Sequence, residues 1–182
     1  MRATLTSRFL PLLNRLLRTP TVFWVMAAMC VAPVGMALVS QHVWGHEPCP
    51  WCILQRVVFL AMALVAVAAA FTRSRWLQRA ALIVIIGLAM AGCAAALWQH
   101  FVAASSQTCN LTLADKIIHG LELDTVLPEV FEPRASCADA IFHFLGMAYE
   151  LWALLLYIVL AVSAMMAIRK TFQIDTVTAR SA

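Results

Sequence analysis

Four long apolar stretches, separated by polar connections, dominate the pattern of hydrophobic and polar positions along the chain. Each is long enough to cross a hydrocarbon layer of about 30 Å as an α-helix. The runs are unbroken, whereas the strands of a membrane barrel alternate between apolar and polar residues. Helices also satisfy every backbone hydrogen bond within their own segment, as lipid requires. We therefore expect four membrane spans, at about residues 21–39, 53–72, 80–98 and 144–168.

Basic residues mark one side of these spans. Ten of the thirteen Lys and Arg lie before the first span, between the second and third, or after the fourth. By the positive-inside rule these segments face the cytoplasm. Both termini are therefore expected in the cytoplasm, and the connections at about residues 40–52 and 99–143 are expected to be outward loops.

The predicted fold is a single all-α membrane domain over residues 1–182, a four-transmembrane-helix bundle with two outward loops. The short link between the second and third spans makes them an antiparallel hairpin. Within the longer outward loop, the stretch LTLADKIIHGLEL predicts a short amphipathic helix on the membrane surface.

An alternative interpretation takes the basic N-terminus and the first apolar run as a cleavable signal peptide. The run is longer than the apolar region of a signal peptide, contains Pro33 and Gly35, and is followed by no clear A-x-A cleavage site. The two loops face outward under either interpretation.

The composition excludes several other classes of protein. Hydrophobic residues make up 63% of the chain and charged residues 12%, against about 45–50% and 25% in soluble domains. A chain with so few polar residues cannot cover the water-facing surface of a soluble enzyme. The same hydrophobic composition excludes a disordered chain. The net charge of +4 does not indicate a nucleic-acid partner, because the basic residues form no continuous face.

The six cysteines fall in two kinds of place. Cys30 and Cys93 lie inside predicted spans, where an unpaired cysteine behaves as a small buried hydrophobe. An outward, oxidising compartment permits disulfides. The four cysteines of the outward loops are therefore the candidates for redox chemistry: Cys49, Cys52, Cys109 and Cys137.

Cys49 and Cys52 form the C-x-x-C pair Cys-Pro-Trp-Cys, a pattern used in dithiol redox chemistry. A bridge across so small a ring gains little chain entropy, so it is better suited to redox cycling than to stabilising the fold. At the start of the second span, Cys52 would also lie at the positive end of a helix, which favours the reactive thiolate.

Cys109 and Cys137 enclose a long loop. A bridge between them would stabilise the fold by roughly 3–4 kcal/mol in the chain-entropy model, which is a purely structural interpretation. The functional interpretation is a second exchangeable disulfide, which approaches the first pair and presents a sulfur to an external thiol. The spacing leaves both open.

Two further residues are candidates for binding an electron acceptor. Arg56 lies four residues after Cys52, on the same helix face. A charge within a span marks a functional site or reaches back to the interface. In a functional role, its guanidinium would stabilise a thiolate and the charge on a reduced quinone oxygen. His100, at the outer end of the third span, is either a bystander or a hydrogen-bond or proton donor to the same acceptor.

Two other functions fit the same cysteines. A membrane metal-binding or transport protein would use Cys49, Cys52 and nearby histidines as ligands. This function needs reduced thiols, which an oxidising compartment disfavours, and the spans lack the interior acidic residues of many ion paths. A structural membrane subunit would use its bridges only to stiffen its loops.

The chain resembles the disulfide bond formation protein B (DsbB) family over nearly its whole length. These are bacterial inner-membrane oxidases that reoxidise the periplasmic dithiol oxidase DsbA and pass its electrons to quinone. A relative of vitamin K epoxide reductase is disfavoured, because no fifth span is found. The resemblance rests on CPWCILQR, on WQHFV, and on Cys109 with LPEVF and SCADAIFHFLG.

The resemblance implies a role for each candidate residue. Cys49 and Cys52 would be the quinone-proximal pair, with Cys52 supplying the thiolate that meets the quinone. Cys109 would form the mixed disulfide with a DsbA-like, thioredoxin-fold partner in the periplasm, and Cys137 would complete that pair. The residues that would contact the cofactor, ubiquinone or menaquinone, are Arg56 and His100.

Overall fold

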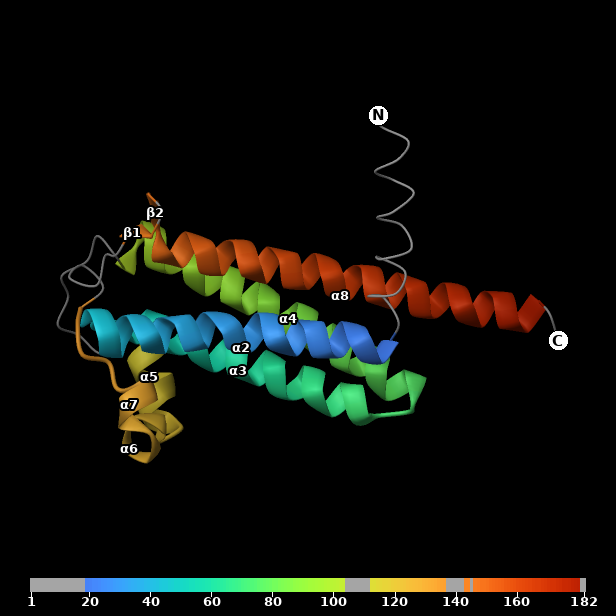
Figure 1. Ribbon diagram of the computed structural model, residues 1–182, viewed down its shortest axis with the longest axis horizontal. Coiled ribbons are helices and arrows are strands. Elements are labelled where there is room, and N and C mark those ends of the chain that lie inside the picture. Colours follow the sequence, from blue (N-terminus) through green and yellow to red (C-terminus); the bar gives the residue numbers. More distant parts are fainter. Residues whose placement is uncertain (1–18, 104–111, 137–142, 145, 181–182) are drawn as a thin grey trace.

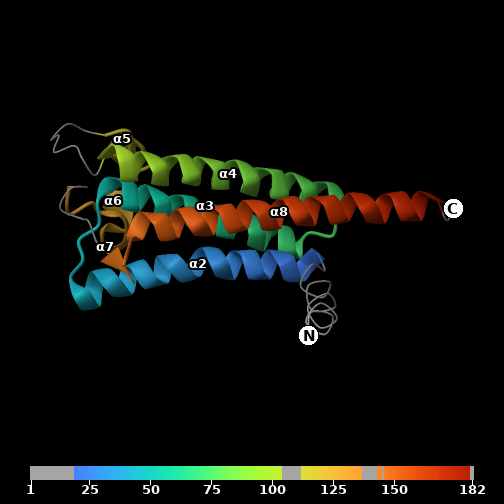
Figure 2. The same ribbon diagram turned by 90° about the horizontal axis from the view of Figure 1, so that it is seen from above.

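Four long helices lie side by side along one axis (Figures 1 and 2). The structure, a computed structural model, describes residues 19–103, 112–136, 143–144 and 146–180. Each of the four helices contains a stretch long and apolar enough to cross a membrane. The predicted all-α membrane bundle is thereby confirmed, with the helices α2 (Thr19–Trp44), α3 (Pro50–Phe71), α4 (Arg75–Phe101) and α8 (Tyr149–Arg180).

The start of α3 positions the C-x-x-C pair. Cys49 is the N-cap residue, and its sulfur accepts a hydrogen bond from the backbone N–H of Cys52 at 3.4 Å. Pro50 is the first helical residue, where a missing N–H costs nothing and the fixed φ suits the helix. The helix therefore begins before the apolar run at residue 53, and Cys52 lies in its first turn.

The bundle is held together by close packing of small and aromatic side chains. α4 packs along α8 and α3, and α2 packs along α3. Many core residues are alanines, which let membrane helices approach closely. Tyr157 of α8 is fully buried; its ring stacks on Phe59 at 4.3 Å, and its hydroxyl donates to the carbonyl of Gln55 at 3.0 Å.

Gly92 of α4 leaves the space that the Tyr157 ring occupies, since a Cβ built at residue 92 would overlap that ring. We expect Gly92→Val to lower the free energy of unfolding by about 1–3 kcal/mol, the usual cost of overpacking. Thermal unfolding in detergent measures the effect. Gly87→Val is the matched control on the same helix, because a Cβ at residue 87 meets nothing within 4 Å. Equal stability of the two variants would contradict this account of the α4–α8 contact.

One end of the bundle carries three short helices, α5 (Leu113–Gly120), α6 (Leu123–Val126) and α7 (Pro128–Phe131). They gather where α2 ends and α3 begins (Figure 1). α5 is the short helix expected in this segment. A capping box of Thr112 and Asp115 starts it. Its buried Ile118 packs against Ile53 of α3 and Phe131 of α7.

The fourth span was expected from about residue 144, but α8 begins at Tyr149. The residues before it form a short antiparallel ladder of β1 (His143–Phe144) and β2 (Met147–Ala148). Gly146, between the two strands, has φ +81°, a conformation that glycine adopts at no steric cost. This turn holds the residues before Tyr149 out of the helix.

Candidate functional site

The two sulfurs of the C-x-x-C pair lie 3.0 Å apart, as neighbouring thiols. A disulfide needs about 2.05 Å, so a small side-chain movement converts one state into the other. The two thiols differ in access. Cys49 is fully buried, whereas Cys52 is partly exposed and lines two cavities. Cys52 is therefore the sulfur that faces any bound molecule.

Cys49 is buried in a small apolar cluster. Trp51, Ala95 and Ala103 pack around it, and Ala114 brings α5 over the same place. A molecule that reaches the Cys49 sulfur must first displace part of this cover. α5 thus contributes to the buried cluster around Cys49, and we expect it to limit access to this sulfur.

We expect Ile118→Ala to speed the alkylation of Cys49 in the reduced protein. Ile118 holds α5 on α3, and truncating a buried isoleucine costs about 2–5 kcal/mol of packing. Mass spectrometry of the labelled peptide, with fragment ions that separate Cys49 from Cys52, measures the rate. Leu113→Ala is the control on the same helix, because Leu113 is exposed. An unchanged rate in Ile118→Ala would show that α5 does not limit access.

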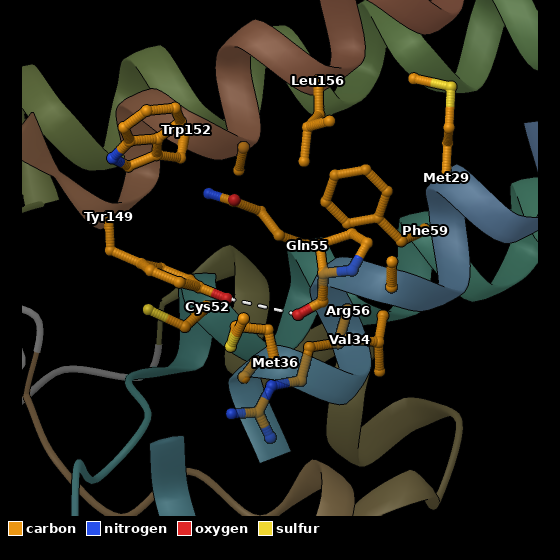
Figure 3. Close-up of a pocket in the computed structure, with 14 residues that line it drawn as sticks. Met29, Val34, Met36, Cys52, Gln55, Arg56, Phe59, Tyr149, Trp152 and Leu156 are labelled. Atoms are coloured by element: carbon orange, nitrogen blue, oxygen red, sulfur yellow. Dashed lines mark hydrogen bonds between the residues drawn. The ribbon is translucent and has the colours of Figure 1, made fainter. Parts of the chain in front are cut away.

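An apolar pocket of about 370 Å³ lies between α2, α3 and α8. Cys52, Arg56 and Tyr149 gather at one end of it, and Met29, Phe59 and Leu156 lie at the other (Figure 3). The Tyr149 hydroxyl donates across the pocket wall to the Pro33 carbonyl at 3.5 Å. Met36, on the lining, is 51% exposed on the outer surface of the bundle. The pocket therefore reaches the side of the bundle that an apolar ligand would approach.

Arg56 is buried, with only 6% of its surface exposed. Its Nη1 donates to Gln41 Oε1 at 2.8 Å and to the Val130 carbonyl at 2.9 Å. Among the described residues, no carboxylate forms a salt bridge with Arg56. A buried charge without a counter-charge is costly. This burial favours a role inside the protein over anchoring at the lipid interface.

His100 is not among the residues that line the apolar pocket. Its Nδ1 lies 2.9 Å from Glu150 Oε1, which links the end of α4 to the start of α8. Glu150 in turn lines a small polar cavity of about 50 Å³ together with Cys52 and Arg56. His100 is thus one side chain removed from the site, and its contact with a cofactor stays a prediction.

The sequence interpretation missed three glutamines that the structure brings to the site. Gln41 binds Arg56, and Gln55 lines the apolar pocket beside it. Gln99 lies within hydrogen-bond distance of the Cys52 sulfur. All three are buried. Placing a polar side chain inside or beside an apolar span costs free energy, so such a residue is a candidate for function. This was the signal in the sequence that could have identified the three glutamines.

Cys109 and Cys137 lie outside the described residues, so their predicted roles stay predictions. The described segment that leads toward Cys137 is tied to the C-x-x-C loop. The backbone N–H groups of Arg134 and Ala135 donate to the Pro48 carbonyl at 3.0 and 3.3 Å. Gln41 also donates to the Glu129 carbonyl at 3.1 Å. These bonds hold the segment before Cys137 beside the residue that precedes Cys49.

The metal-binding alternative finds no support in the described part of the chain. No group of three or more His, Cys, Asp or Glu side chains is arranged there to hold a metal ion. The hydrogen-bond partners of the two cysteine sulfurs include each other and the Gln99 amide. An amide nitrogen is a hydrogen-bond donor rather than a metal ligand.

Comparison with known proteins identifies the family. The family model for disulfide bond formation protein DsbB matches residues 19–167. Disulfide bond formation protein B of Aromatoleum aromaticum is 34% identical over 156 residues, which cover 84% of this chain and 93% of the relative. Disulfide bond formation protein B 1 of Pseudomonas savastanoi pv. phaseolicola is 33% identical, over 76% of this chain and 82% of the relative. Disulfide bond formation protein B of Ralstonia nicotianae is 30% identical, over 80% of this chain and 91% of the relative. The chain therefore belongs to the DsbB family of disulfide-generating membrane oxidoreductases.

Proposed function

We propose that this protein reoxidises a periplasmic, DsbA-like dithiol oxidase of the thioredoxin fold and passes the electrons through two cysteine pairs to a membrane quinone. One observation carries the proposal. The accessible sulfur of the C-x-x-C pair, Cys52, and the buried guanidinium of Arg56 share one end of an apolar pocket between membrane helices.

The lining of this pocket fits a quinone. Its walls are apolar over most of their length, which suits a ring that dissolves in lipid. Its polar groups are concentrated at one end, where Cys52 and Arg56 would hold the ring near a carbonyl oxygen. A bound quinone, ubiquinone or menaquinone, supplies the acceptor for two electrons and two protons. DsbA has a reduction potential of about −120 mV, so thiol buffers such as glutathione do not drive its reoxidation.

The side chains around Cys52 have separate tasks in this reaction. The partly exposed Cys52 sulfur presents the electron pair to the pocket. Arg56 uses Nη1 for Gln41 and Val130, and no hydrogen-bond partner of its Nε or Nη2 is found among the described residues. These N–H groups are the donors available to negative charge in the site. Apolar walls such as Phe59 and Leu156 exclude water, which strengthens that interaction.

Two thiol–disulfide exchanges would bring electrons to this pair. A thiolate of the partner attacks Cys109 of a Cys109–Cys137 disulfide, and the second partner thiol then releases the partner as a disulfide. The reduced Cys109 and Cys137 attack the Cys49–Cys52 disulfide in turn, which restores their own bridge. Each exchange moves two electrons. The backbone bonds from Arg134 and Ala135 to Pro48 support the second exchange, because they hold the loop near Cys49.

The proposed location is the bacterial inner membrane, with both termini in the cytoplasm and the redox loops in the periplasm. The short helices α5–α7 and the start of α3 lie together at one end of the bundle (Figure 1). Arg73 and Arg75 lie at the link between α3 and α4, at the other end. The positive-inside rule assigns that basic end to the cytoplasm.

Mixing the purified protein with a reduced thioredoxin-fold oxidase and a soluble quinone tests the function. We expect the quinone absorbance to fall, with one quinone consumed for each partner dithiol oxidised. Omitting the partner, or supplying it already oxidised, should stop the reaction. Correctly folded protein that gives no turnover with any tested quinone would defeat the proposal.

A further inference from the structure

Two buried glutamine side chains form a chain of hydrogen bonds that ends on the cysteine pair. Gln55 of α3 is 4% exposed and Gln99 of α4 is 6% exposed. Gln55 Nε2 donates to Gln99 Oε1 at 2.8 Å. Gln99 Nε2 then lies 3.2 Å from the Cys52 sulfur and 3.7 Å from the Cys49 sulfur. Neither glutamine was among the residues singled out in the sequence.

The order of the bonds decides which end of the Gln99 amide meets the sulfurs. A side-chain amide has one oxygen acceptor and one nitrogen that donates. Gln55 occupies the oxygen of Gln99, so the N–H₂ group faces the cysteines. Gln55 is itself held in place, because its backbone carbonyl accepts the Tyr157 hydroxyl at 3.0 Å. The donor is thus oriented by the Gln55 side chain of α3, whose backbone is in turn bonded to α8.

An N–H donor stabilises the deprotonated sulfur far more than the protonated sulfur. A neutral thiol or a disulfide sulfur is a weak acceptor, whereas a thiolate accepts a charge-assisted hydrogen bond. The gain is larger in a buried site than in water. The Gln99 amide therefore stabilises the thiolate relative to the thiol and the disulfide. Since it lies closer to Cys52 than to Cys49, the thiolate is favoured on Cys52.

We propose that Gln99 is a catalytic residue that stabilises the Cys52 thiolate, and that Gln55 is the positioning residue that orients the Gln99 amide. The inference rests on the proposed use of the Cys52 thiolate. When an incoming thiolate attacks the Cys49 sulfur, a new S–S bond forms to Cys49 and the Cys49–Cys52 bond breaks. The electron pair of that bond leaves on Cys52, and the Gln99 N–H₂ group donates to it.

The test measures the thiolate directly, without partner or quinone. The reduced protein in detergent is alkylated with iodoacetamide at pH 7 and at pH 10, and fragment-ion mass spectrometry follows Cys52. We expect Gln99→Leu to slow the reaction at pH 7 by about tenfold, as the loss of a hydrogen bond to a charged group predicts. At pH 10 the variant should react like the wild type, because the thiol then ionises without help.

Two further variants complete the test. Gln55→Met should slow alkylation at pH 7 by about threefold, a smaller effect since Gln99 remains but is free to turn. Gln78→Leu is the matched control. Gln78 is also buried in α4, but it donates to the Thr72 carbonyl at the other end of the bundle. This variant should react like the wild type at both pH values.

Three results would overturn the inference. If Cys52 in Gln99→Leu were alkylated at pH 7 at the wild-type rate, Gln99 would have no effect on the thiolate. Equal slowing at pH 7 and pH 10 would show that Gln99 only affects access to the sulfur. Faster reaction at both pH values would mark a loss of packing. Failure of quinone reduction would leave these rates unaffected, so the two proposals fail separately.

Discussion

Replacing Cys52 by serine is expected to lower quinone reduction to the rate measured without enzyme, a loss of at least about a thousandfold. The serine hydroxyl is close in size but has no accessible anion and forms no disulfide with Cys49. Cys52 is also the partly exposed member of the pair and lines the apolar pocket. Among the described residues, no other cysteine lines that pocket. Quinone absorbance with saturating reduced partner measures the loss.

Cys93→Ser is the matched control for this variant. Cys93 lies in α4, is partly buried against the core of the bundle, and is a free thiol like Cys52. It has no place in the proposed electron path, so its variant should keep wild-type turnover. Turnover of Cys52→Ser above a tenth of the wild-type rate would show that electrons reach the acceptor by another route.

Arg56→Met is expected to lower kcat/KM for quinone by about a hundredfold, the usual effect of removing one preorganised donor to developing charge. Methionine preserves most of the apolar contact of the arginine stem but removes the guanidinium at the Cys52 end of the pocket. Arg56→Lys should recover part of the activity, since it restores the charge but not the planar set of donors. Steady-state rates over a range of quinone concentration separate the effects on kcat and KM.

Arg79→Met controls for the removal of a buried arginine in general. Arg79 is also buried, but it lies toward the other end of the bundle, where Nη2 donates to the Thr171 carbonyl at 3.0 Å and the guanidinium lies 4.3 Å from the Phe172 ring centroid. Its loss should lower the melting temperature without changing the KM for quinone. If Arg56→Met and Arg79→Met had the same kinetics, Arg56 would have no special role at the pocket.

Features that depend on near neighbours in the chain were predictable. The position of Arg56 one turn after Cys52 follows from helix geometry, and the structure places both at one end of the pocket. The position of His100 in the last turn of the third span also follows from the sequence. Its pairing with Glu150 does not, because Glu150 belongs to another helix and comes 50 residues later.

The sequence by itself determined the membrane bundle and the local form of the redox pair. Long apolar runs cross the membrane as helices, because a helix satisfies its own backbone hydrogen bonds where there is no water. Pro50, directly after Cys49, begins α3, so Cys52 lies in the first turn of that helix. Only the tertiary structure decided which polar groups surround that pair. Gln41, Gln99 and Val130 reach Arg56 or Cys52 from other elements of the fold. The apolar faces of the helices are chemically alike, so the pattern along the chain does not specify which faces meet; close packing of particular side chains does.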